Sequence, residues 1–91
     1  RCSYSMASGT GLFDHDSMDW DAELLETLGV TREQLSPLVD VGDAVQGVRP
    51  PFRERLGRLA HAPWHPALGD GACSNVGSGG VTPRRATLMI G

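Results

Sequence analysis

Residues 67–83 read "ALGDGACSNVGSGGVTP" and place a single acid among glycines and other small residues. An apolar lead-in ends at Gly69, a lone carboxylate follows at Asp70, and glycines and other small residues come after it. Glycine permits a tight turn, and the small residues after Asp70 predict a short helix. We therefore expect Asp70 at the carboxyl end of a strand and the amino end of a helix, a place where open α/β sheets bind ligands.

Asp70 has two interpretations at this point. As a plain helix cap, its carboxylate would accept hydrogen bonds from the amides of Ala72 or Cys73, and the pattern by itself favours this interpretation. As a functional acid, its carboxylate would turn outward, and the small residues Gly71 and Ala72 would let a substrate approach the backbone. The pattern leaves both interpretations open.

The first third of the chain shows one clear helix. Residues 21–30, "DAELLETLGV", group leucines on one face, with Asp19 or Asp21 as the cap and Gly29 as the stop. Residues 3–14 alternate weakly in hydropathy, which predicts strands or a hairpin interrupted by glycine.

The rest of the chain continues this mixture of predicted helices and strands. Thr31 and Gln34 have the spacing of a capping box at the start of a second short helix. Residues 50–62 predict a third helix, residues 63–68 a strand leading into Gly69, and residues 85–91 a buried strand. Strands that alternate with helices indicate the α/β class.

Composition excludes several classes of function. The chain has 91 residues, of which 40% are apolar and only 5% aromatic, so we expect one small domain with a thin core. The net charge of −3 argues against a nucleic-acid partner. All eight basic residues are arginine, which excludes a phosphate-binding lysine loop and a Schiff-base lysine. The sequence contains no apolar run of the roughly 20 residues that cross a bilayer, so we expect no membrane partner.

Two clusters of possible metal ligands do not match a known spacing. Residues 14–21 are rich in aspartate, but a calcium loop starting at Asp14 would have Met18 at its fifth position and no glycine at its sixth. His61 and His65 are four residues apart, but Pro63 prevents a regular helix between them. We therefore predict no metal site in this chain.

Two further motifs also have simple structural interpretations. Gly77–Gly80, "GSGG", has no lysine to hold a phosphate and predicts a turn that ends a helix. Cys2 and Cys73 lie far apart and in no metal spacing, and we predict two free thiols in a cytoplasmic setting.

Taken together and in order, five stretches resemble the FGGY carbohydrate kinases, and within them the gluconokinases and xylulokinases. The stretches are "SMASGTGLFD" (residues 5–14), "DWDAELLETLGV" (19–30), "REQLSPLV" (32–39), "PWHPALGDGACSNVGSGGVTP" (63–83) and "RATLMIG" (85–91). Each stretch is weak evidence alone, but their order over the whole chain is specific.

This resemblance implies an RNase H-like or actin-like α/β fold with a domain boundary near the end of the chain. Residues 1–83 would be the C-terminal part of an N-terminal sugar-binding domain. Residues 84–91 would be the first strand leading into a nucleotide domain that this piece lacks. ATP and Mg²⁺ would be required by the intact enzyme, with no cofactor-binding residue in this piece.

The resemblance also implies a function. The intact enzyme would transfer the γ-phosphate of ATP to a hydroxyl of a sugar or sugar acid, with gluconate favoured, and Asp70 would be the general base. Gly71 occupies a substrate-contacting position that is often Gln or Asn in relatives, and glycine offers only its backbone. We expect the piece alone to be inactive and to self-associate. The alternative is a non-catalytic α/β interaction module, or an inactive kinase-like piece, in which Asp70 is only a helix cap.

Overall fold

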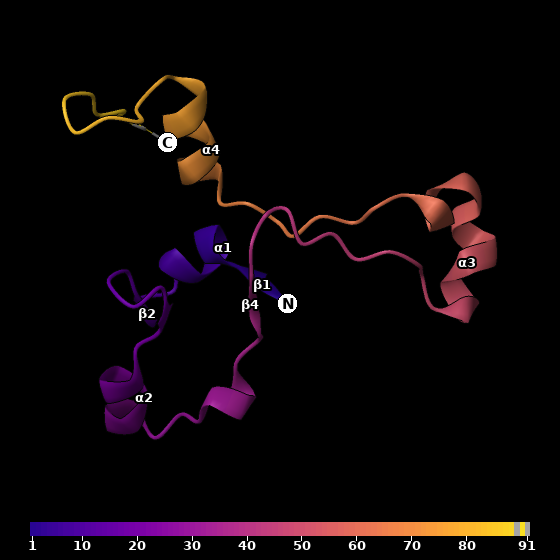
Figure 1. Ribbon diagram of the computed structural model, residues 1–91, viewed down its shortest axis with the longest axis horizontal. Coiled ribbons are helices and arrows are strands. Elements are labelled where there is room, and N and C mark those ends of the chain that lie inside the picture. The colour runs from indigo at the N-terminus through magenta and orange to yellow at the C-terminus, as the bar shows by residue number, and fades with distance from the viewer. Residues whose placement is uncertain (89, 91) are drawn as a thin grey trace.

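The computed structural model describes residues 1–88 and 90 and shows a mixed α/β chain, as predicted. Its elements, in order, are β1 (Cys2–Ser3), α1 (Tyr4–Ser8), β2 (Phe13–Asp14), β3 (Asp19–Trp20), α2 (Ala22–Leu28), a 3₁₀ turn (Arg32–Gln34), β4 (Leu38–Val39), α3 (Pro50–Leu56), a second 3₁₀ turn (Gly57–His61) and α4 (Asp70–Gly77). Helix α3 lies apart from α1 and α2, at the end of two long connecting segments (Figure 1).

Two short strand pairs organise the N-terminal part of the chain. Strand β1 pairs in parallel with β4, with Cys2 opposite Leu38, and β2 pairs with β3 in an antiparallel hairpin. The strands predicted over residues 3–14 are wrong for residues 4–8, which form helix α1. The reason is a local hydrogen bond, because the Ser3 hydroxyl accepts from the amide of Met6 at 3.1 Å and so caps a helix.

Helix α2 confirms the clearest prediction from the sequence. The carboxylate of Asp21, and not that of Asp19, accepts the amide of Leu24 at 2.9 Å. Gly29 ends the helix with a φ of 67°, a left-handed conformation that glycine adopts without strain. The amide of Val30 then donates to the carbonyl of Leu25 at 3.0 Å, which completes a Schellman-type end.

The core is thin, as the composition predicts, and it lies among these N-terminal elements. Ala7, Phe13, Trp20 and Leu25 form one buried cluster, in which the rings of Phe13 and Trp20 meet edge to face. The indole nitrogen of Trp20 donates to the carbonyl of Ser36 at 3.2 Å, so the ring is held at its polar end as well. Burial of these apolar side chains stabilises the N-terminal part of the chain through the hydrophobic effect.

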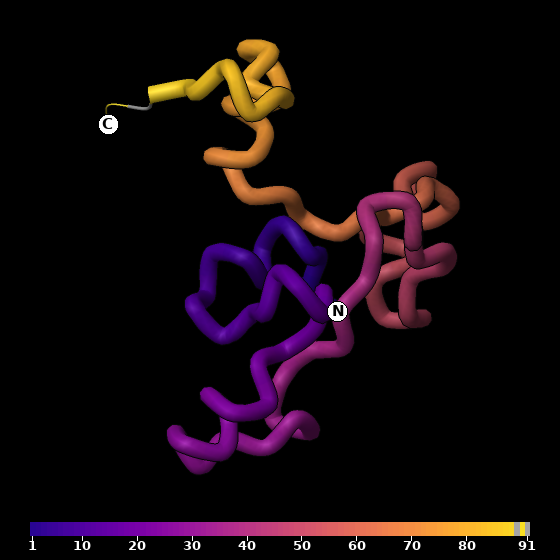
Figure 2. The backbone as a smooth tube through the Cα atoms, turned by 60° about the vertical axis from the view of Figure 1, so that its left-hand side comes forward, coloured from indigo at the N-terminus to yellow at the C-terminus, as the bar shows by residue number. Residues whose placement is uncertain are grey.

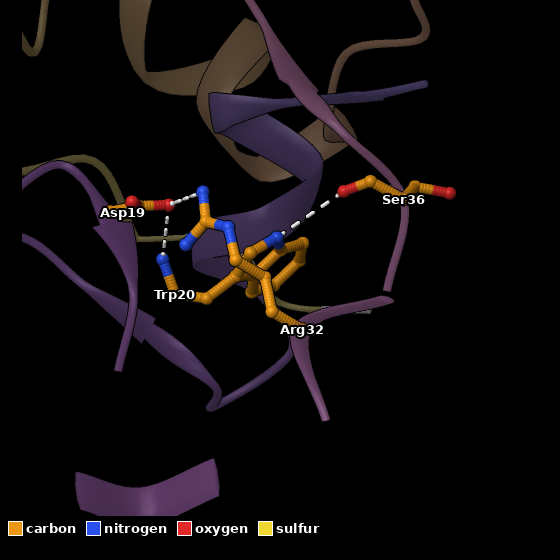
Figure 3. A network of polar contacts seen from close by, with 4 residues as sticks. All are labelled: Asp19, Trp20, Arg32 and Ser36. Atoms are coloured by element: carbon orange, nitrogen blue, oxygen red, sulfur yellow. Dashed lines mark hydrogen bonds and ion pairs between the residues drawn. The ribbon is translucent and has the colours of Figure 1, made fainter. Parts of the chain in front are cut away.

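An ion pair lies beside this cluster (Figure 3). Arg32, on the first 3₁₀ turn, donates to the carboxylate of Asp19 on β3 at 2.7 Å. Figure 3 also shows the amide of Trp20 donating to the same carboxylate, at 2.8 Å. These hydrogen bonds, first the one from Arg32, hold the pKa of Asp19 below its usual value.

The predictions for the second half of the chain need correction. Residues 63–68 are not a strand; a single antiparallel bridge joins Trp64 to Val45 instead. Pro63 and Pro66 have no amide hydrogen to donate to a longer ladder. The helix predicted over residues 50–62 ends at Leu56, because Gly57 takes a φ of 52° and a 3₁₀ turn follows.

The predicted C-terminal strand falls only partly on described residues. Residues 84–88 and 90 form no strand, and the side chain of Leu88 is 84% exposed. Met89 and Gly91, which belong to the same prediction, lie outside the described residues. A strand requires a partner for its amide and carbonyl groups, and the described residues provide none here.

Within residues 1–88 and 90, no helix combines the length and the apolar character needed to cross a membrane.

Candidate functional site

Asp70 is the first residue of helix α4, at the end of an extended segment. Gly69, with φ −67° and ψ 135°, occupies the capping position, and its carbonyl accepts the amide of Cys73 at 3.0 Å. The change from extended chain to helix therefore occurs where the sequence predicts it, although the segment before it is not a strand. The helix-cap interpretation of Asp70 is wrong in detail, because Gly69 is the cap residue and the Asp70 carboxylate accepts the amide of Gly71, not that of Ala72 or Cys73.

The carboxylate of Asp70 is exposed to solvent and only partly engaged. One oxygen, Oδ1, accepts the amide of Gly71 at 2.7 Å. The other oxygen, Oδ2, makes no hydrogen bond to any of residues 1–88 and 90. One oxygen is thus oriented by the backbone while the other is available to a ligand.

Gly71 lies directly beside this carboxylate. Its amide donates to Asp70, and its carbonyl accepts the side-chain amide of Asn75 at 2.9 Å. A Cβ built on Gly71 would meet no atom within 4 Å, so the space beside its backbone is open. The two residues singled out in the sequence, Asp70 and Gly71, thus share a hydrogen bond, and the space beside the Gly71 backbone is open.

Two serines that the sequence analysis did not single out hold the segment before Asp70. The hydroxyl of Ser3 donates to the carbonyl of Ala67 at 2.5 Å, and the hydroxyl of Ser5 accepts the amide of Gly69 at 3.0 Å. Figure 2 shows the segment that leads into α4 passing beside the first residues of the chain. Each contact joins residues 64 positions apart, and nothing in the local pattern "SYS" signals such a distant partner.

The glycine motif after α4 is a helix-terminating turn, as predicted. The amides of Gly79 and Gly80 donate back to the carbonyls of Val76 and Asn75, at 3.0 and 2.7 Å. Gly79 has a φ of 78°, and a Cβ on Gly80 would lie 2.6 Å from the hydroxyl of Thr87. These glycines allow the chain to reverse tightly and to pack closely, so their presence needs no phosphate ligand.

An apolar hollow of about 390 Å³ lies on one side of α4. Its lining consists of Ser5, Leu68, Ala72, Cys73, Val76 and Gly77. Asp70 is not part of this lining, and a polar sugar would find almost no hydrogen-bonding partners in it. We therefore place the candidate site at the carboxylate and not in the hollow.

The remaining candidates from the sequence lie in ordinary structural settings. His65 places Nδ1 3.0 Å from the carbonyl of Val41, and Cys2 and Cys73 are free thiols, as predicted. In the residue cluster 14–21, Asp14 accepts the amide of Asp16 at 2.9 Å within the β2–β3 turn. Hydrogen bonds, first that of Ser17, lower the pKa of Asp14.

Comparisons with known proteins point to one family. Residues 1–77 match the family model described as the N-terminal domain of the FGGY family of carbohydrate kinases. Over 88 residues, 97% of the chain, it is 32% identical to a gluconokinase of Bacillus subtilis (strain 168) and 26% identical to a xylulose kinase of the same organism. The aligned stretch is 17% of the gluconokinase and 18% of the xylulose kinase, so the chain spans about a sixth of these relatives.

A solved structure agrees with these matches. The crystal structure of a ligand-bound xylulose kinase from Lactobacillus acidophilus superposes with a TM-score of 0.77 at 26% identity, covering 86% of this chain and 16% of that one. The match confirms the predicted RNase H-like, actin-like α/β fold class. The chain therefore belongs to the FGGY family of carbohydrate kinases, and it corresponds to part of that family's N-terminal domain.

Proposed function

We propose that the protein containing this chain transfers the γ-phosphate of ATP to a hydroxyl of a sugar acid, gluconate, with Asp70 as the general base. The observation that carries this proposal is the state of the Asp70 carboxylate. It is exposed at the amino end of α4, with Oδ1 held by the amide of Gly71 and Oδ2 without a partner among the described residues.

The chemistry of phosphoryl transfer requires little more than this from the residues around the hydroxyl. The reaction depends on alignment and on neutralising charge, and one positioned carboxylate suffices to accept the proton of the attacking hydroxyl. The oriented Oδ1 fixes the plane of the carboxylate, so Oδ2 is presented to the substrate. The open space beside the backbone of Gly71 leaves room for the sugar.

ATP and Mg²⁺ enter this proposal as requirements of the whole protein. Mg²⁺ would neutralise charge on the transferred phosphate. In the part of the chain that the structure describes, no group of three or more His, Cys, Asp or Glu side chains could hold a metal ion. These residues do not fit a metal site of their own, so we assign no step to a metal held by this chain.

Gluconate is proposed because the match to a gluconokinase is stronger than the match to a xylulose kinase, at 32% against 26% identity over the same length. Gly71 supports no side-chain contact to the substrate, so its own contribution would come from the backbone. A cytoplasmic location is part of the same proposal, because both cysteines are free thiols, which is typical of a reducing compartment.

The test is a phosphorylation assay on the purified whole protein. ADP release is measured with MgATP and, in separate reactions, gluconate, xylulose or no sugar. Gluconate should give the highest kcat/KM, and an Asp70→Asn variant should lose the sugar-dependent signal. Xylulose as the better substrate would overturn the choice of substrate, and a fully active Asp70→Asn variant would overturn the role of Asp70.

The 91-residue chain alone should show no activity in this assay, since we assign it no nucleotide-binding residue. Light scattering on the same sample tests the expected self-association, for which exposed apolar side chains such as Phe52, Leu59 and Trp64 provide contact surface.

A further inference from the structure

Two serines hold the segment before Asp70, and the contact between Ser5 and Gly69 is the closer of the two to Asp70 along the chain. The hydroxyl of Ser5, on helix α1, accepts the amide of Gly69 at 3.0 Å. Gly69 is the capping residue of α4, and its amide has no partner within the helix that follows. Ser5 therefore supplies a hydrogen bond that the helix itself cannot provide.

Gly69 is held on both sides of its peptide backbone. Its amide donates to Ser5, while its carbonyl accepts the amide of Cys73 and so begins the helix. Asp70 is the next residue, so the direction in which its side chain leaves the backbone follows from the orientation of Gly69. A shift of this one residue relative to α1 would move the carboxylate directly.

The two segments approach so closely at Gly69 that a larger residue would press against Ser5. A Cβ on Gly69 would lie 3.3 Å from the hydroxyl oxygen of Ser5 and 3.6 Å from its carbonyl oxygen. The first distance is tighter than an ordinary contact, so Ser5 would have to move. The φ of Gly69 is −67°, which any residue can adopt, so the close contact and not the backbone conformation restricts this position.

Ser3 has a different role in the same region. Its hydroxyl donates to Ala67 and also accepts the amide of Met6, and the residue is almost fully buried. Ser3 therefore stabilises both α1 and the chain crossing, and its loss would disturb the fold. Ser5 is only half-buried and lies in the lining of the hollow beside α4, so it can be changed with less effect on the core.

We propose that Ser5 is a positioning residue: through the amide of Gly69 it sets the place of the Asp70 carboxylate relative to the sugar hydroxyl. This inference rests on the proposed function of Asp70. Misplacing a catalytic group by about 1 Å can cost on the order of 100-fold in rate. Loss of one neutral hydrogen bond allows a smaller displacement, so we expect Ser5→Ala to lower kcat by about 10-fold to 100-fold.

The test uses the whole protein and separates positioning from a general structural effect. Ser5→Ala should lower kcat while the KM values for the sugar and ATP stay within about threefold, because in this proposal Ser5 acts through the Gly69 amide and not on either substrate. Ser5→Thr keeps the hydroxyl and should restore most of kcat. Ser8→Ala is the matched control, since Ser8 lies on the same helix and its hydroxyl only donates locally to the carbonyl of Ser5, at 2.8 Å.

Hydrogen exchange gives a readout that does not depend on activity. In Ser5→Ala, a peptide that contains Gly69 should exchange faster than in the wild-type protein, and in Ser8→Ala it should not. Gly69→Ala provides a second route to the same displacement. Because its new Cβ meets the hydroxyl of Ser5, the double variant Ser5→Ala/Gly69→Ala should have a kcat no lower than that of Ser5→Ala.

The outcomes distinguish the positioning role of Ser5 from the proposed role of Asp70 as general base. If Asp70→Asn is inactive but Ser5→Ala keeps kcat within twofold, the positioning role is wrong and the proposed function stands. If Asp70→Asn keeps wild-type turnover, both are wrong. A fall in kcat for Ser8→Ala equal to that for Ser5→Ala would also overturn the positioning role, because the effect would then follow from α1 in general.

Discussion

Replacing Asp70 by asparagine separates its chemical role from its structural one. Asparagine has nearly the same shape, and its Oδ1 can still accept the amide of Gly71, which lies 2.7 Å away in the structure. The change removes only the charge and the basic Oδ2. Since Oδ2 makes no hydrogen bond to residues 1–88 and 90, no described contact is lost.

The expected magnitudes differ enough to be distinguished. A negative charge in the first turn of a helix stabilises it by about 0.3–1 kcal/mol, so unfolding should change by no more than that. Loss of a general base lowers the rate by about 10²-fold to 10⁴-fold, which corresponds to about 2.7–5.4 kcal/mol of transition-state stabilisation. The catalytic effect should therefore exceed the structural effect by at least about 1.7 kcal/mol.

The assay measures kcat and KM by sugar-dependent ADP release, and the melting temperature on the same samples. We expect kcat to fall by at least about 100-fold with the sugar KM within about threefold of wild type. Glu23→Gln is the matched control, because Glu23 is also an acid in the first turn of a helix, α2. The reasoning is refuted if kcat falls less than about threefold in Asp70→Asn, or if Glu23→Gln loses as much activity.

Three further predictions concern the fold and are checked by urea denaturation. Leu25→Ala should cost about 2–5 kcal/mol, because Leu25 is 6% exposed in the core, while Leu28→Ala on the same helix, 55% exposed, should cost less than about 1 kcal/mol; equal losses would contradict the assignment of the core. Gly29→Ala should cost about 1–2 kcal/mol because of the φ of 67°, and a neutral effect would mean that α2 ends differently. The hydrogen bond from Arg32 lowers the pKa of Asp19 in the folded chain, so this contribution to stability is present above about pH 4 and is lost as the pH falls through the lowered value. Arg32→Gln should therefore flatten the loss of stability below pH 4, and an unchanged acid profile would exclude this role for the ion pair.

Several parts of the candidate site could be read from neighbouring residues in the sequence. Gly69, Asp70 and the small residues after them predict a helix start with a carboxylate in its first turn, and α4 begins there. The glycines after α4 predict where the helix ends, because glycine readily adopts the backbone conformation of a helix-ending turn. The backbone hydrogen bonds that begin and end α4 join residues no more than five positions apart, so the local order of residue types is enough to predict them.

The two errors have different causes, a local helix cap in one case and a distant strand partner in the other. Residues 4–8 form a helix because the Ser3 hydroxyl caps it. The weak alternation of hydropathy in this region wrongly suggested a strand. Residues 63–68 are extended, but prolines and the lack of a neighbouring strand among the described residues leave only the bridge at Trp64. A strand is defined by the groups that pair with it, and a single segment does not specify them.

Residue order alone was therefore enough to predict the helix α2 with its stop, the turn after α4, and the acid at the start of α4, because each depends on contacts between near neighbours. The pairing of β1 with β4, and the contacts by which Ser3 and Ser5 hold the segment before Asp70, became known from the folded structure. Those contacts join residues 64 positions apart in the case of the serines, and a hydroxyl can hydrogen-bond to almost any backbone group that the fold brings near it. Which group that is depends on how the whole chain packs.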